Sequence, residues 1–121
     1  MPPNNPPALD REALLERVGG DVEFLQEIAG LFLEDCPKLL TAIQTAVSDG
    51  DARKLEYAAH ALKGSIANFG ADAAREAAFR LEAMGRAGDL KPASDAYLTL
   101  EQEVQRFTLE LCALSDELAR G

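Results

Sequence analysis

Apolar residues recur at alternating intervals of three and four along most of this chain, and this period limits the possible folds more than any other feature. Such spacing places the apolar side chains on one narrow face of a helix. The clearest example follows Pro92, and its members are Tyr97, Leu100, Val104, Phe107, Leu111, Leu114 and Leu118. The sequence therefore predicts a long amphipathic helix there, whose apolar face must pack against other helices.

Three earlier stretches repeat this pattern, each bounded by residues that start or stop helices. Asp21 is the predicted N-cap of the first, and Asp51 is the predicted N-cap of the second, which ends near Gly70. The third follows Gly70 and is predicted to stop at Gly85 and Gly88. Their apolar residues are Leu25, Ile28, Ala29, Phe32, Cys36, Leu39, Leu40, Ile43 and Val47, then Leu55, Ala59, Leu62, Ile66 and Phe69, then Ala74, Ala77, Leu81 and Met84.

Pro37 lies inside the first of these long helices. A proline in a helix interior loses one backbone hydrogen bond and crowds the preceding turn. We therefore expect a kink near Leu33, with the helix resuming afterwards.

A shorter helix of about two turns is predicted after Asp10, which is followed by helix-forming residues and then by two glycines. Phe24 and Leu31 lie off the main apolar face of the next helix and make a second apolar strip. We expect this strip to receive the short helix through Leu14 or Leu15.

Four long helices with short connections predict an all-α fold, an antiparallel up-and-down four-helix bundle with the short N-terminal helix packed across one end. Runs of β-branched residues are absent. A length of 121 residues suits one domain. We place this domain at residues 9–121 and interpret residues 1–8 as a flexible, proline-rich tether.

Charge and composition exclude several classes of function. Acidic residues outnumber basic ones by 21 to 12, which is the wrong sign for a nucleic-acid partner. The chain has no signal peptide and no apolar run of about eighteen residues, so we expect a cytoplasmic protein without membrane insertion. Cys36 and Cys112 form no C-x-x-C pair, which argues against a zinc site or a redox motif and favours reduced thiols.

His60, the only histidine, follows the apolar-face residue Ala59 by one position. It is therefore rotated by roughly 100° from that face and should be accessible to solvent. Lys63 and Gly64 lie three and four residues further on, on the same side of the helix. Glycine inside a helix costs about 1 kcal/mol relative to alanine, so Gly64 needs another explanation. With no side chain there, another protein's active site can approach the imidazole, and a phosphoryl group on the ring has room.

These residue types suit phosphoryl transfer. A neutral histidine nitrogen is nucleophilic near physiological pH, and the Lys63 ammonium is suited to neutralising phosphate oxygens. Arg53 and Lys54, about two turns before His60, are expected to make the surroundings less negative than the whole chain. Glu56 lies four residues before His60 and raises the alternative of metal binding, but two ligands do not make a site, so we expect no metal here.

The segment around His60 closely resembles the signature of the histidine phosphotransfer (HPt) domain family, H-x-L-K-G-S followed by A-N-x-G. It reads His60-Ala61-Leu62-Lys63-Gly64-Ser65 and then Ala67-Asn68-Phe69-Gly70. The later Leu81-Glu82 and Gly88-Asp89-Leu90 resemble the next helix of that family and the turn after it. The resemblance extends from about Leu9 to the last helix and is strongest from Leu55 to Leu90.

This resemblance implies roles for individual residues. His60 would be phosphorylated on the ring nitrogen that faces solvent, Lys63 would contact the phosphate, and Gly64 would leave clearance. Gly70 would end the helix that carries the histidine. Glu82, on the neighbouring helix, would accept a hydrogen bond from the other ring nitrogen and so fix the tautomer.

Ser65 is rotated toward the core, where its small size is expected to matter; a hydrogen bond to the phosphate or to the backbone is the alternative. Docking of a partner is expected around His60, through Ala67 and through Leu14 or Leu15 of the short helix. Such relay contacts are small and transient.

The resemblance also implies a phosphorelay intermediate of two-component signalling, a phosphoryl carrier without catalytic activity of its own. Its partners would be response-regulator receiver domains, whose aspartates exchange the phosphoryl group, and a hybrid sensor histidine kinase. We expect a monomer without cofactor, with Mg²⁺ held by the partner receiver domain. Two alternatives stay open: a non-phosphorylated helical adaptor that binds receiver or kinase domains, and the phosphoacceptor domain of a kinase whose ATP-binding region lies elsewhere.

Overall fold

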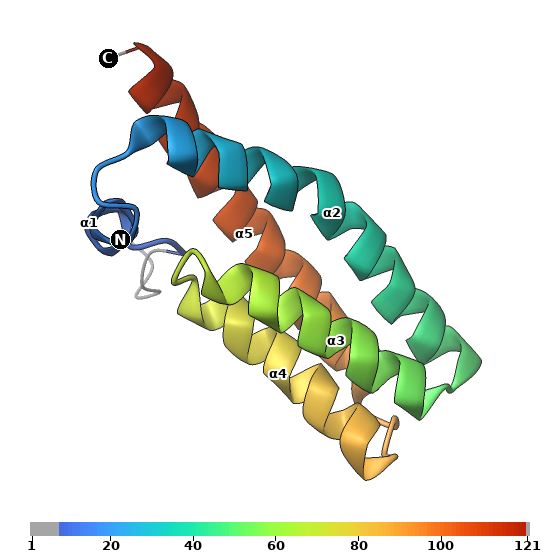
Figure 1. The fold of residues 1–121 in the computed structure, drawn as a ribbon. Coiled ribbons are helices and arrows are strands. Elements are labelled where there is room, and N and C mark those ends of the chain that lie inside the picture. The colour runs from blue at the N-terminus through green and yellow to red at the C-terminus, as the bar shows by residue number, and fades with distance from the viewer. Residues whose placement is uncertain (1–7, 121) are drawn as a thin grey trace, which may run out of the picture.

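The computed structural model describes residues 8–120, which form helices and no strand. The helices are α1 (Arg11–Arg17), α2 (Val22–Asp49), α3 (Ala52–Ala67), α4 (Asp72–Ala87) and α5 (Ala93–Arg120). Helices α2 to α5 run antiparallel as a bundle, and α1 lies beyond the ends of the two shorter helices, α3 and α4 (Figure 1). The predicted all-α bundle with a short N-terminal helix is confirmed.

Three helices begin at the aspartates that the sequence predicts. The side chains of these residues accept hydrogen bonds of 3.0 to 3.1 Å from the backbone N–H groups three positions on, in the pairs Asp10 with Ala13, Asp21 with Phe24, and Asp51 with Lys54. Each bond satisfies a donor that the first turn of a helix leaves free. These local contacts set where α1, α2 and α3 start.

Helix α2 continues past Pro37 without interruption. It ends at Gly50, whose φ of 68° is the left-handed conformation that glycine adopts most readily. The next residue, Asp51, starts α3, so the two helices are joined by a very short connection. This tight turn makes α2 and α3 antiparallel neighbours.

The predicted apolar faces meet in one core. Three phenylalanine rings lie at its centre, Phe32 from α2, Phe69 from the α3–α4 connection and Phe107 from α5, with centroids 5.2 to 5.5 Å apart. Tilted and edge-on contacts of this kind suit the charge distribution of aromatic rings. Among residues 8–120, no helix is both long and apolar enough to cross a membrane.

The sequence predicted that Gly85 would end α4, but Gly85 lies inside this helix and forms a contact with α3. Helix α4 continues to Ala87. A Cβ atom on Gly85 would lie 2.6 Å from the backbone nitrogen of Glu56 and 2.7 Å from the carbonyl oxygen of Ala52. Since no side chain fits in that space, the glycine allows the backbones of α3 and α4 to touch.

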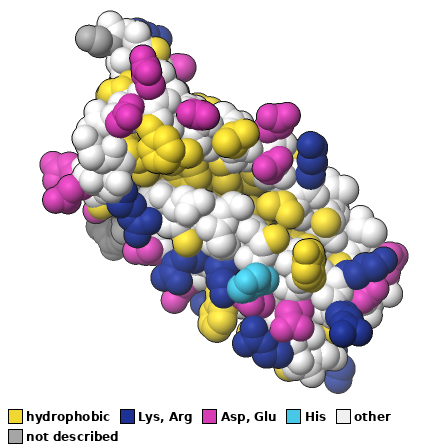
Figure 2. Space-filling model, in the orientation of Figure 1, with side chains coloured by type: hydrophobic (Ala, Val, Ile, Leu, Met, Phe, Trp, Pro, Cys, Tyr) yellow, Lys and Arg dark blue, Asp and Glu magenta, His cyan; other side chains and the backbone are white. Residues whose placement is uncertain are grey.

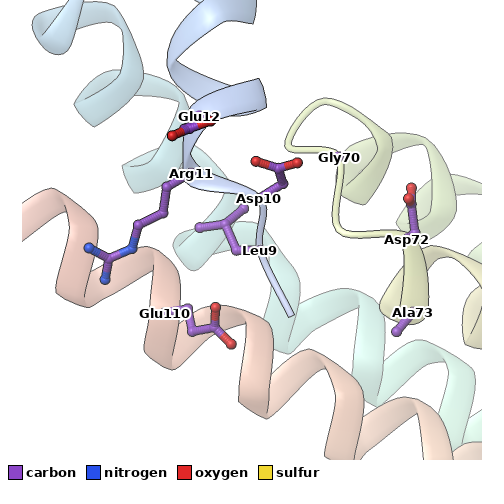
Figure 3. Close-up of a pocket in the computed structure, with 8 residues that line it drawn as sticks. All are labelled: Leu9, Asp10, Arg11, Glu12, Gly70, Asp72, Ala73 and Glu110. Carbon is purple, nitrogen blue, oxygen red and sulfur yellow. The ribbon is translucent and has the colours of Figure 1, made fainter. Parts of the chain in front are cut away.

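The folded domain begins one residue earlier than predicted. Ala8 and Leu9 are buried, and the Ala8 N–H donates a 2.9 Å hydrogen bond to the Glu110 carboxylate on α5. Figure 3 shows Leu9 extending from this segment into the space between α5 and the start of α4. Ala8 therefore belongs to the core and not to a tether. The rest of the predicted tether, residues 1–7, and Gly121 lie outside the described residues.

Helix α1 does not cover the apolar strip on α2, contrary to the sequence prediction. Phe24 and Leu31 remain 48% and 57% exposed. Instead, α1 lies at the end of α3, where the Arg17 guanidinium donates a 2.6 Å hydrogen bond to the carbonyl oxygen of Ala67. Helix α3 has no basic residue in its last turn, so Arg17 supplies the cation that a helix C-terminus favours.

Candidate functional site

His60 lies on the exposed flank of α3, with its side chain 69% exposed. Its Nδ1 atom is 2.8 Å from Oε2 of Glu82 on the neighbouring helix α4. An ionised carboxylate can only accept hydrogen bonds, so Nδ1 carries the proton and donates it. The lone pair of the neutral ring is then on Nε2, at the side of the ring away from Glu82.

Glu82 is a buried carboxylate, 2% exposed, with three partners. Besides His60, Nζ of Lys63 lies 2.7 Å from Oε1, and Nη2 of Arg86 donates a 3.1 Å hydrogen bond to Oε2. Burial by itself raises the pKa of Glu82, but the contacts with Lys63 and then with His60 outweigh it and hold the pKa below its ordinary value of 4.5. The carboxylate is therefore ionised at neutral pH, as a fixed acceptor for His60 must be.

Lys63 is held by charge and by an aromatic ring. Oε1 of Glu82 accepts no hydrogen bond of favourable angle from the described residues, so its contact with Lys63 is an ion pair. The ammonium also lies 5.2 Å from the centroid of the Phe79 ring, within the range of a cation–π contact. Phe79 is an exposed apolar residue of α4, and the structure places its ring beside the lysine.

Arg86 joins the two helices of the site, a role that the sequence analysis missed. Its Nε atom donates a 3.0 Å hydrogen bond to Oε2 of Glu56 on α3, while its Nη2 atom contacts Glu82 on its own helix. Glu82 and Arg86 are four residues apart, a spacing at which helical side chains meet, and this was the one available signal. With His60 and Arg53, these residues line a pocket of about 350 Å³.

Gly64 is exposed, and a Cβ atom added to it would meet nothing within 4 Å. The fold itself therefore does not need a glycine at this position. Ser65 is half-buried, and Gly70, with a φ of 69°, lies in the connection after α3 has ended at Ala67. Among these residues, the structure brings only Gly64 onto the open side of the helix beside His60.

Leu14 is a core residue with no exposed surface, which corrects its assignment as a docking residue. Because α1 is short and turns one face inward, this leucine packs into the bundle and no partner can reach it. Leu15 and Ala67 are half-buried and remain at the surface.

The surroundings of His60 are less negative than the whole chain, as the sequence predicts. Helices α3 and α4 carry six basic and four acidic side chains, although the chain has a net charge of -9. Figure 2 shows basic side chains on both sides of the histidine. Helices α3 and α4 together therefore carry a small positive charge within an acidic protein.

A larger pocket of about 680 Å³ lies at the α1 end of the bundle, lined by Asp10, Arg11 and Glu110 among others (Figure 3). None of the side chains that contact His60 lines it. Across residues 8–120, no three His, Cys, Asp or Glu side chains lie close enough together to hold a metal ion.

The lowered pKa of Glu82 predicts how the site responds to acid. The unfolded chain binds the carboxyl proton more readily than the folded protein, so the stabilisation from Glu82 is complete above pH 4.5 and is lost as the pH falls through the lower folded-state pKa. We expect the difference in unfolding free energy between the wild type and Glu82→Gln to shrink as the pH falls from about 7 to about 3. Urea unfolding across this range measures it, and a difference independent of pH would contradict the assignment.

Comparison with known proteins identifies the family of the chain. Residues 27–109 match the family model of the Hpt domain. The fold is similar to the crystal structure of histidine-containing phosphotransfer protein B from Pseudomonas aeruginosa PAO1, with a TM-score of 0.85 and 24% identity over 93% of this chain and 98% of that one. No curated protein sequence matches the chain. Since the family model covers more than half of the sequence, the chain belongs to the Hpt domain family and is a histidine phosphotransfer protein of phosphorelay signalling.

Proposed function

We propose that Nε2 of His60 is the phosphoacceptor and that the protein relays the phosphoryl group between receiver-domain aspartates. The observation that carries this proposal is the hydrogen bond between Nδ1 and the buried carboxylate of Glu82, on a ring that is otherwise exposed. It holds the ring in one tautomer and orients the nucleophilic nitrogen outward.

In the accepting step, the lone pair of Nε2 forms a bond to phosphorus. The bond between phosphorus and the aspartate oxygen of the receiver breaks, and the aspartate leaves as a carboxylate. The imidazole keeps its proton on Nδ1 and becomes cationic, and the negative charge of Glu82 stabilises it, as a buried carboxylate does for a histidine in other nucleophilic sites. Attack by an aspartate of a second receiver reverses these changes and passes the group on.

Lys63 would neutralise the phosphoryl oxygens, and Gly64 would leave space beside the phosphoryl group. The Lys63 ammonium lies one turn from His60 and supplies a point charge for the oxygens, and the open space at Gly64 admits the partner's active site. Transfer of this kind depends on positioning and charge neutralisation. The domain is then a carrier without catalytic activity or cofactor of its own, and the receiver supplies the Mg²⁺.

The receiver would dock on the face shared by α2 and α3. Figure 2 shows hydrophobic side chains along this face on the same side of the molecule as the histidine. A groove of about 210 Å³ there is lined by Leu31 and Leu39 of α2, by Ser65 of α3 and by Asn68, which follows α3. Leu15 of α1 and Ala67 of α3, which are half-buried at the surface, would add to the docking face. The basic side chains around His60 suit an acidic receiver pocket.

Within this proposal the protein acts as a cytoplasmic monomer, and a hybrid sensor histidine kinase is the source of the phosphoryl group. The receiver domain of that kinase would load His60, and a response regulator would unload it. Both contacts would be small enough to exchange quickly.

The test is incubation of the full chain with a radiolabelled, phosphorylated receiver domain. We expect acid-labile, base-stable label on the wild type and none on His60→Gln, because glutamine has no nucleophilic ring nitrogen. Equal label on the variant would refute the proposal. Binding of the receiver without any label on the wild type would identify the protein as an adaptor instead.

A further inference from the structure

Glu82 has more cationic partners than its single charge requires. Lys63 contacts Oε1, whereas Arg86 shares Oε2 with His60. The two cations therefore occupy different oxygens of one buried carboxylate. The contact of Lys63 with Oε1 can therefore break while the contact of Arg86 with Oε2 is kept.

Lys63 is the cation that can leave. Its ammonium lies 2.7 Å from Oε1 of Glu82, and its side chain is 24% exposed. The ammonium has three donors and can turn toward phosphoryl oxygens on Nε2 of His60, which draws it away from Oε1. Moving away from a buried carboxylate is costly when it leaves the charge without a cation.

Arg86 is the cation that stays. Its planar guanidinium uses separate nitrogens for Glu56 on α3 and for Glu82 on α4, at 3.0 and 3.1 Å. The preceding residue, Gly85, is the point at which the two helix backbones touch. The Arg86 side chain is 62% exposed, and its guanidinium has partners on both helices.

We propose that Arg86, held between Glu56 and Glu82, keeps the buried Glu82 charge paired while Lys63 leaves it for the phosphoryl group on His60. Arg86 is then a positioning residue: it touches neither the phosphoryl group nor the reacting nitrogen, and it acts by releasing Lys63. This inference rests on the proposed function of His60.

The experiment measures single-turnover transfer from a phosphorylated receiver to the full chain as a function of receiver concentration. Arg86→Gln is expected to lower the maximal rate on the order of tenfold, because Lys63 is then retained by Glu82. The receiver concentration at half the maximal rate should not change. Arg86→Lys should restore most of the rate, and Lys91→Gln, which removes one exposed charge from the α4–α5 connection, is the matched control.

Two double variants separate this role from a structural or docking role. In a Glu82→Gln background there is no charge to retain Lys63, so adding Arg86→Gln should cause no further loss of rate. In a Lys63→Gln background there is no ammonium to release, and the same result is expected. Urea unfolding of each protein confirms that the rates compare folded molecules.

Several results would overturn the inference. They are an unchanged or faster maximal rate for Arg86→Gln, a shift in the half-saturating receiver concentration alone, or an equal loss of rate in both double variants. An absence of label on His60 in the wild type would instead refute the proposed function, so the two failures are distinguishable.

Discussion

Gly85→Ala is expected to destabilise the protein by about 2 kcal/mol, despite the higher helix propensity of alanine. The added Cβ would lie 2.6 and 2.7 Å from backbone atoms of α3, which cannot move aside as a flexible side chain can. The two helices must separate, and the hydrogen bond from His60 to Glu82 then lengthens. Urea unfolding measures the first effect, and the rate of phosphoryl transfer measures the second, which we expect to fall.

Gly64→Ala is the matched control, since it makes the same change within α3. Nothing lies within 4 Å of the added Cβ, so the higher helix propensity of alanine should stabilise the protein by up to about 1 kcal/mol. If the two variants had the same stability, the contact at Gly85 would not constrain the distance between α3 and α4.

Gly64→Gln is expected to slow transfer by at least about tenfold while leaving the fold nearly unchanged. The glutamine side chain would extend into the open space beside the His60 ring, where the receiver's active site has to approach. Single-turnover transfer measures the rate, and circular dichroism with urea unfolding checks the fold.

Gly30→Gln provides the comparison for this variant. Gly30 is another exposed glycine inside a helix, with nothing within 4 Å of an added Cβ, but it lies on α2. Its transfer rate should match the wild type. A Gly64→Gln protein as fast as Gly30→Gln would show that clearance at this position is not needed.

The helices could be predicted because their signals are local. The N-cap aspartates Asp10, Asp21 and Asp51 bond to backbone groups three residues away, so the start of each helix is visible in a short segment. The apolar period likewise depends only on the helix itself. Helix order and fold class followed from these features.

The site was only partly accessible from sequence. His60, Lys63 and Gly64 belong to one helix and share one side of it, so spacing alone brings them together. Glu82 lies 22 positions from His60 along the chain, and the prediction that it would meet the ring rested on resemblance rather than on spacing. The hydrogen bond from Arg86 to Glu56 depends on how α3 and α4 pack against each other, and no pattern within one helix predicts that packing.

Sequence patterns could not distinguish the role of Gly85 from that of Gly88, or the role of Leu14 from that of Leu15. Gly85 and Gly88 look alike as stop signals, but only Gly88 adopts a left-handed conformation, with a φ of 73°. Gly85 has to lack a side chain because the backbone of α3 lies against it. The residues next to Gly85 in the sequence do not indicate this contact. Leu14 and Leu15 are adjacent apolar residues on a short helix, and only the packed structure shows which of them turns inward.

The described contacts of the His60, Lys63 and Glu82 side chains come from residues 52–87, the hairpin of α3 and α4. The outer helices α2 and α5 support this hairpin through apolar packing, and cores accept many substitutions when volume and pattern are kept. Tolerance to sequence change should therefore differ sharply within one small domain. Outside the docking groove, α2 and α5 can diverge wherever their apolar faces are preserved, whereas the hairpin is constrained residue by residue.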